Sequence, residues 1–321
     1  MSKQMNVKIN GSYTLGATVT IPVGDLVKYP AIVMVHGSGL VDRDSNAKGM
    51  PMNIFKELSE LAAVHGFASI RYDKRGIGES EGDYYEAGVK DLIDDAKAAL
   101  EFVKEHPQID AEKVILLGHS EGSIIAPFVN EKVPVSGMIL LAGTAEPLAD
   151  TTEWQREQMI QDIRTLTGLQ GWLVRFLKVD QKIMKMNDSL MEVIKGSTEP
   201  VIKYKWKKIN AKWNREHLEY DVSKVLPLVT CPVLAITGSK DVNVKVTDLP
   251  KIKELVAGEC ETHVIEHMTH MLRKTDVEYR MSKIINQNKK SVQKPIDSEL
   301  KEILSNWLEN WKSKELNTEE A

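Results

Sequence analysis

Hydrophobic and polar positions follow two alternating periodicities along the first 145 residues. Residues 12–23 alternate with period two, and short apolar runs long enough for buried strands occur at 31–35, 114–117 and 135–142. A further strand is predicted at 67–72. Between these runs, apolar residues recur at helical spacing, which predicts helices over 53–65, 86–106 and 120–131. This alternation of strand and helix predicts a mostly parallel central sheet with helices on both faces.

The alternation stops at residues 147–220, where long helical stretches such as 153–166 and 171–186 take over and no strand pattern is found. Beyond them the pattern predicts a strand at 232–237, a helix at 246–257, a strand at 261–266 and an amphipathic helix at 298–311. We therefore expect an α/β core formed by residues 1–146 and 221–321, with residues 147–220 inserted as a helical cap.

Composition is that of a folded protein, with 42% hydrophobic and 27% charged residues among 321. The 42 Lys and Arg against 46 Asp and Glu leave a net charge of −4, so we expect neither nucleic acid nor membrane as a partner. No apolar run approaches the 18 residues or so of a membrane span.

Two cysteines, Cys231 and Cys260, are too few for a disulfide framework, and their places at the starts of predicted strands favour small core residues. The N-terminus has no apolar stretch typical of a secretory signal. A reducing cytoplasm is the expected compartment.

The first candidate for chemistry is Gly118-His119-Ser120-Glu121-Gly122, which lies directly between a predicted strand and a predicted helix. A serine on such a sharp turn holds its hydroxyl exposed in a strained backbone, and flanking glycines permit close backbone contacts. Alone, a G-x-S-x-G sequence is weak evidence, but this context favours a nucleophilic serine at Ser120.

A serine nucleophile needs a base, and the base needs an acid to orient it. Asp241 follows the predicted strand 232–237, at the carboxyl end where catalytic groups of open α/β sheets lie. After the next strand come His267 and His270, which complete the order Ser, Asp, His. Either histidine satisfies this order.

The chain resembles the α/β-hydrolase superfamily, and within it the small intracellular carboxylesterases and serine-aminopeptidase-like hydrolases. The resemblance rests on the serine motif and on four further segments: His-Gly-Ser-Gly at 36–39, Tyr-Asp-Lys-Arg-Gly-Ile-Gly-Glu-Ser at 72–80, Thr-Gly-Ser-Lys-Asp at 237–241 and His-Met-Leu-Arg at 270–273. It implies that His270 is the base and that His267 packs beside the site.

The resemblance also implies that the backbone N–H groups of Ser38 and Glu121 form the oxyanion hole, with Gly39 as the alternative to Ser38. It implies further that the charges of Asp73 and Arg75 tie loops together near the nucleophile, and the charged residues at 42–44 either do the same or contact substrate.

These residues lead us to expect a serine hydrolase that cleaves short- to medium-chain carboxylic esters through an acyl-enzyme, with a small-molecule ester as partner and without a cofactor. The alternatives are a peptidase, amidase or thioesterase with the same triad, and a non-catalytic binding protein on the same fold. A homodimer is left open.

Three other patterns in the sequence bear on function. A metal site at His263, His267 and His270 is disfavoured because these residues do not share a helix face. The basic and aromatic residues at 203–208 fit a nucleic-acid patch, but a solvated helix face is favoured because acids are plentiful nearby. The tryptophans and methionines of the insert either form its own core or roof an apolar acyl pocket, and no interfacial apolar helix is evident.

Overall fold

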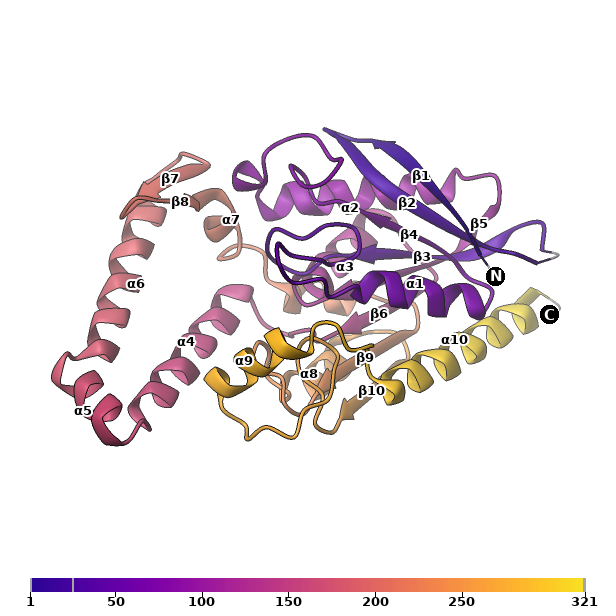
Figure 1. Ribbon diagram of the computed structural model, residues 1–321. Coiled ribbons are helices and arrows are strands. Elements are labelled where there is room, and N and C mark those ends of the chain that lie inside the picture. The colour runs from indigo at the N-terminus through magenta and orange to yellow at the C-terminus, as the bar shows by residue number, and fades with distance from the viewer. Residues whose placement is uncertain (1, 25, 320–321) are drawn as a thin grey trace.

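An eight-stranded sheet runs through the centre of the protein in the computed structural model, which describes residues 2–24 and 26–319. Its strand order is β1-β2-β4-β3-β5-β6-β9-β10. The six strands from β4 to β10 are parallel, whereas β2 pairs antiparallel with both β1 and β4. Helices cover both faces (Figure 1). The predicted α/β-hydrolase fold, with a mostly parallel sheet between helices, is confirmed.

The strands are β1 (Ser2–Asn10), β2 (Thr14–Pro22), β3 (Tyr29–Val35), β4 (Ala68–Tyr72), β5 (Ile109–His119), β6 (Gly137–Leu141), β7 (Val201–Tyr204), β8 (Lys207–Asn210), β9 (Val233–Gly238) and β10 (Cys260–Ile265). The α-helices are α1 (Ile54–Val64), α2 (Val89–Lys104), α3 (Glu121–Lys132), α4 (Leu148–Arg164), α5 (Gly168–Phe176), α6 (Val179–Gly196), α7 (Ala211–Glu216), α8 (Asp248–Leu255), α9 (Met281–Ser291) and α10 (Ser298–Glu319). Three single-turn 3₁₀ helices are η1 (Tyr84–Glu86), η2 (Val222–Lys224) and η3 (Leu226–Leu228).

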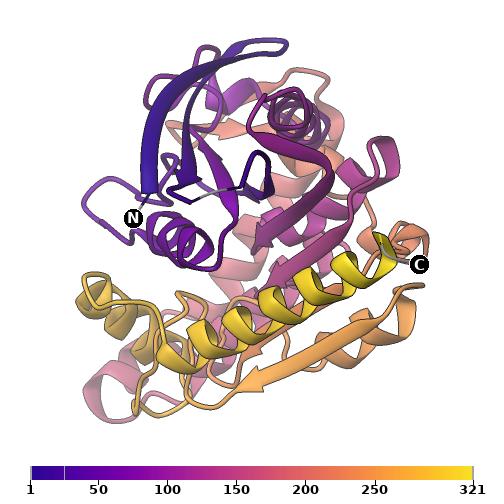
Figure 2. The same cartoon turned by 90° about the vertical axis from the view of Figure 1, so that its right-hand side faces the viewer.

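Central strands such as β3 and β6 are apolar almost throughout because both faces of the sheet are covered. Along β3, Ala31, Val33 and Val35 point into one core, and Ile32 and Met34 point into the other. Helices α2, α3 and α8 close the first core, and α1 and α10 close the second. Figure 2 shows α10 lying across its face of the sheet. Both cores hold the carboxyl ends of β5, β9 and β10 in fixed positions.

The N-terminal strand was missed by the sequence analysis. β1 pairs with β2 along its whole length, yet its side chains are mostly exposed, since it is an edge strand with one thin apolar row. Helix α9 was also missed. Among the described residues, no helix is both long and apolar enough to cross a membrane.

Residues 147–220, called the insert below, contain α4 to α7 and the two-stranded sheet β7–β8. The expectation that this segment lacks strands was wrong. The β7–β8 turn holds Lys205 and Trp206 at positive φ (44° and 68°), where hairpins usually carry Asn or Gly, so the sequence gives no turn signal. The stretch 171–186, expected to be one helix, is divided between α5 and α6 at Lys178, whose φ is 48°.

Candidate active site

Ser120 lies on the turn between β5 and α3, with φ 57° and ψ −121°. This backbone conformation is strained for a residue with a side chain, and neighbouring glycines permit it. A Cβ on Gly122 would collide with the carbonyl oxygen of Val35 in β3, and one on Gly118 would collide with the carbonyl of Gly122. Helix α3 therefore packs directly on the sheet, and the Ser120 hydroxyl stands above the end of β5.

The side chains of Ser120, His270 and Asp241 form one chain of hydrogen bonds. Nε2 of His270 lies 2.9 Å from Oγ of Ser120, and its Nδ1 lies 2.8 Å from Oδ2 of Asp241. These residues follow β5, β10 and β9, whose carboxyl ends meet at one edge of the sheet. His267 is outside this chain: its imidazole is half exposed and lies 3.9 Å from the carboxylate of Asp276.

Asp241 and His270, the two partners of Ser120, are fixed in place by further hydrogen bonds. The other oxygen of Asp241, Oδ1, accepts hydrogen bonds from the amides of Asn243 (2.7 Å) and Val244 (3.0 Å). Burial lowers the pKa of His119 to about 4, so its ring is neutral at pH 7, and Nε2 contacts the backbone oxygen of His270 at 3.0 Å. That contact is a hydrogen bond from Nε2–H, and it fixes the backbone that carries the His270 ring.

The two amides expected to form an oxyanion hole are available. Within the part of the chain that the structure describes, neither Ser38 N–H nor Glu121 N–H donates a hydrogen bond to the protein. Gly37 packs against Ser120, since a Cβ there would lie 3.6 Å from the Ser120 Oγ. Lys74 holds this loop through a 2.7 Å hydrogen bond to the Gly37 carbonyl. A free donor from each side of Ser120 is the arrangement that an oxyanion requires.

The carboxylate of Glu121 has a role that the sequence analysis did not foresee. It is buried, and it accepts hydrogen bonds from Nε1–H of Trp213 (2.6 Å) and from Nε2 of His217 (2.8 Å), while Nζ of Lys74 lies 3.3 Å away. Burial alone would raise the pKa of Glu121, but Lys74, His217 and Trp213 outweigh it and lower the pKa to about 2. The sequence did contain one indication of this role: an acidic residue directly follows the serine, at the start of a helix that is otherwise buried.

Trp213 and His217 belong to the insert, so Glu121 joins the insert to the turn that carries Ser120. Through Lys74 the same carboxylate is connected to the loop at Gly37.

Two cavities lie near this site. The smaller, of about 130 Å³, is lined by Ser120 and His270, by apolar residues that include Val41, Met52 and Ile54, and by polar ones such as Ser45. The larger, of about 630 Å³, lies between the insert and the core, and Asn243 borders both.

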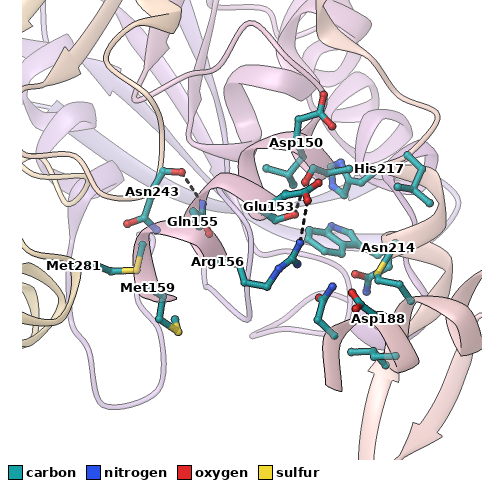
Figure 3. Close-up of a pocket in the computed structure, with 18 of the residues that line it drawn as sticks. Asp150, Glu153, Gln155, Arg156, Met159, Asp188, Asn214, His217, Asn243 and Met281 are labelled. Carbon is teal, nitrogen blue, oxygen red and sulfur yellow. Dashed lines mark hydrogen bonds and ion pairs between the residues drawn. The ribbon is translucent and has the colours of Figure 1, made fainter. Parts of the chain in front are cut away.

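The larger cavity carries charged groups on its wall (Figure 3). Arg156 makes an ion pair with Glu153 at 3.7 Å, and Asp150 of α4 and Asp188 of α6 also line the cavity. Trp213 and His217 close the end nearest Glu121. Of the expected roof, Met159, Met191 and Trp213 line this cavity, whereas Trp172, Trp206 and Phe176 face solvent.

The charged residues near 42–44 and 73–75 form ion pairs that join separate segments of the chain. Arg43 binds Asp73 and Glu79, and Arg75 binds Asp91 and Asp95. Arg71 pairs with Asp44.

Among the described residues, no group of three or more His, Cys, Asp or Glu is arranged to hold a metal ion. Cys231 and Cys260 are free and half-buried, and burial raises the pKa of each thiol to about 11. Neither thiol is activated as a nucleophile.

The fold defines the protein as an α/β hydrolase. The sequence profile of the serine aminopeptidase family S33 matches residues 48–276, and the chain belongs to this family. Esterase EstD of Thermotoga maritima is 28% identical over 284 residues, which are 86% of this chain and 63% of that protein. The chain thus spans less than two thirds of that relative's length.

Solved structures agree on the fold. Est1E of Butyrivibrio proteoclasticus with bound ferulic acid superposes with a TM-score of 0.57 at 15% identity, covering 88% of this chain and 96% of Est1E. An esterase of Pyrococcus furiosus superposes with a TM-score of 0.58 at 16% identity, covering 97% of this chain and 91% of that one.

Proposed function

We propose that the protein is a serine hydrolase of short- to medium-chain carboxylic esters, acting through Ser120, His270 and Asp241. The observation that carries this proposal is the hydrogen-bond chain Asp241–His270–Ser120, which ends in a cavity that contains the Ser120 hydroxyl. The kinship with esterase EstD supports ester cleavage as the reaction.

In the first half of the reaction, Oγ of Ser120 attacks the ester carbonyl carbon while Nε2 of His270 takes the hydroxyl proton. The carbonyl oxygen becomes an oxyanion and accepts hydrogen bonds from the Ser38 and Glu121 amides, each worth about 3 kcal/mol in the transition state. Asp241 stabilises the imidazolium. The C–O bond to the alcohol then breaks, and His270 returns the proton to the leaving oxygen.

In the second half, His270 removes a proton from water, and the hydroxide attacks the acyl group on Ser120. The second tetrahedral intermediate collapses, the carboxylic acid leaves, and Ser120 regains its proton from His270. No cofactor takes part in this scheme.

The two cavities suggest how the ester is oriented. The small cavity at Ser120 suits a short acyl chain, since burying each methylene against Val41, Met52 and Ile54 is worth about 0.8 kcal/mol until the walls are reached. The larger cavity suits a bulkier alcohol, since residues such as Leu148, Met159 and Met191 can contact its hydrocarbon part while Arg156 and Asp150 offer polar contacts.

The test combines an ester panel with labelling of the nucleophile. Catalytic efficiency, kcat/KM, should rise severalfold per carbon from acetyl esters to an optimum at short or medium length and then fall. Ser120→Ala should lose about 10⁴-fold or more in kcat and all labelling by a fluorophosphonate, with Ser305→Ala on helix α10 as the control. Activity that keeps rising to long-chain triglycerides would contradict the substrate range, and a labelled Ser120→Ala protein would exclude Ser120.

An aminopeptidase is the second candidate, because the family is named for that activity and the carboxylates of Asp150, Glu153 and Asp188 suit a substrate ammonium group. Comparing turnover of an aminoacyl amide with that of the matching ester separates the two. An inactive, unlabelled protein would favour the non-catalytic binding alternative.

A further inference from the structure

Helix α5 turns its apolar side outward. Its large apolar residues, with the one that follows the helix, recur at helical spacing and are between 41% and 79% exposed: Leu169, Trp172, Leu173, Phe176 and Leu177. The rings of Trp172 and Phe176 stack on each other at 5.2 Å in solvent. A monomer gains nothing from this orientation, because water-facing apolar groups contribute no burial energy, so a contiguous patch of this kind marks a contact surface.

The packing of α5 explains why the patch faces out. Gly171 is the buried residue of this helix, and a Cβ at that position would collide with the carbonyl of Leu166. The helix therefore lies with its backbone against the segment after α4, and its side chains point away from the insert. Figure 1 places α5 at the end of the insert farthest from the sheet.

A second exposed aromatic lies at the other end of α6. Trp206 stands on the β7–β8 turn and is fully exposed, between Lys205 and Lys207. The α5 residues above and Trp206 together are called the aromatic edge of the insert.

The charge around the aromatic edge has the sign opposite to that of the whole chain. Residues 164–208 contain ten Lys and Arg but four Asp and Glu, although the chain has a net charge of −4. Within this segment the acid Asp180 is engaged by Arg164 at 2.7 Å. The edge therefore combines exposed Trp, Phe and Leu with an excess of positive charge.

We propose that the aromatic edge docks the protein on an anionic membrane surface, with Trp172, Phe176 and Trp206 entering the interfacial layer. Aromatic and leucine side chains on a short helix flanked by basic residues are what such a layer binds, and each basic residue adds attraction to acidic lipid. This departs from two expectations drawn from the sequence. Net charge averages over a basic insert and an acidic core, and α5 exposes an apolar face where no interfacial apolar helix was expected.

A second copy of the chain is a poorer occupant. Two-fold pairing of this edge sets basic segments of equal sign against each other. One face of a nine-residue helix also offers less than the roughly 800 Å² per partner of a standard interface.

The test is cosedimentation of the full chain with vesicles of phosphatidylcholine alone and of phosphatidylcholine with phosphatidylglycerol. Binding should be about tenfold or more stronger to the anionic vesicles and should weaken as salt is raised. Trp172→Ser with Phe176→Ser should reduce binding about tenfold or more, and Lys205→Glu with Lys207→Glu should also weaken it. The matched control is Leu26→Ser with Val27→Ser, two exposed apolar residues on the core. Thermal melts verify that each variant is folded.

Four results would overturn the proposal. The first is no binding to anionic vesicles by the folded wild-type protein, and the second is an equal loss in the core control. The third is that the wild-type protein binds no vesicles but forms a dimer in sedimentation velocity, and that the Trp172/Phe176 substitutions abolish this dimer. The fourth is that duplex DNA or RNA binds in competition with vesicles, and that the Trp172/Phe176 substitutions leave the affinity for nucleic acid unchanged.

Discussion

At the scale of single residues, His267 and His270 lie three positions apart and differ in what their rings can reach. The His270 ring is buried between Ser120 and Asp241, whereas the His267 ring is half exposed. His270→Ala should therefore lower kcat about 10⁴-fold, because members of a triad act as a unit, and His267→Ala should change it by less than about tenfold. Steady-state kinetics of the two variants on one ester measures this. A larger loss in His267→Ala would transfer the role of base to that residue.

Glu121 offers a second test, on a side chain that acts through its neighbours. Glu121→Gln keeps the shape but removes the charge that faces Lys74, so Lys74 is left buried without a counter-ion. We expect a loss of stability of about 3 kcal/mol and a roughly tenfold decrease in kcat, with KM nearly unchanged, because the amide beside Ser120 and the Gly37 loop shift together.

Glu131→Gln is the matched control for Glu121→Gln, since Glu131 is exposed on the same helix, α3. Denaturant unfolding and separate kcat and KM values distinguish the two effects. A variant at Glu121 that loses stability but keeps wild-type kcat would show that the carboxylate serves folding alone.

Ser120 and Asp241 could be found from the sequence because each follows a strongly apolar strand, and the pair of candidate histidines because it follows an alternating strand. The carboxyl ends of parallel strands lie at one edge of a sheet, which brings these residues together. Resemblance was needed to choose His270. The partners of Glu121 could not be found, because Trp213 and His217 lie 92 and 96 residues away and their approach depends on how the insert folds back.

At the scale of elements, the turn from β5 into α3 depends on close backbone contact with β3. Gly122→Ala puts a methyl group into the carbonyl of Val35, so either α3 or β3 must move. We expect a loss of several kcal/mol, as for other overpacked cores, with a large decrease in activity. Gly196→Ala is the control, because a Cβ at Gly196 meets nothing within 4 Å. Urea unfolding of both variants tests this, and equal stabilities would contradict the packing argument.

The elements that could be predicted are those whose pattern is strong on its own. Buried parallel strands such as β3 and β9 are continuous apolar runs, and α2 has a wide apolar face. The elements that were missed owe their form to a neighbour: β1 is an exposed strand that β2 holds, and the β7–β8 hairpin turns without glycine or asparagine.

At the scale of the whole molecule, stability should depend on pH through two buried histidines. Burial lowers the pKa of His36 to about 3 and that of His119 to about 4, from 6.5 in the unfolded chain. Around His36, the charge of Lys74 favours the neutral ring, while Asp73 and the hydrogen bond to the Tyr72 carbonyl oppose this. Both rings are therefore neutral in the folded protein at pH values where the unfolded chain binds protons.

A lowered pKa in the folded state means that the unfolded chain binds more protons below pH 6.5, so stability should fall with acidification. The free energy of unfolding should be nearly constant above pH 7 and should decrease between pH 6.5 and 4, with a slope of up to about 2.7 kcal/mol per pH unit for two histidines. Glu121, with its pKa lowered to about 2, adds a further loss only below pH 4.5, so its contribution is separated from that of the histidines. Urea unfolding at intervals from pH 8 to 4 measures the slope, and His36→Asn should reduce it by about half. A free energy of unfolding that stays flat from pH 7 to pH 5 would mean that both rings reach solvent in the folded protein, which would contradict the closed packing behind Ser120.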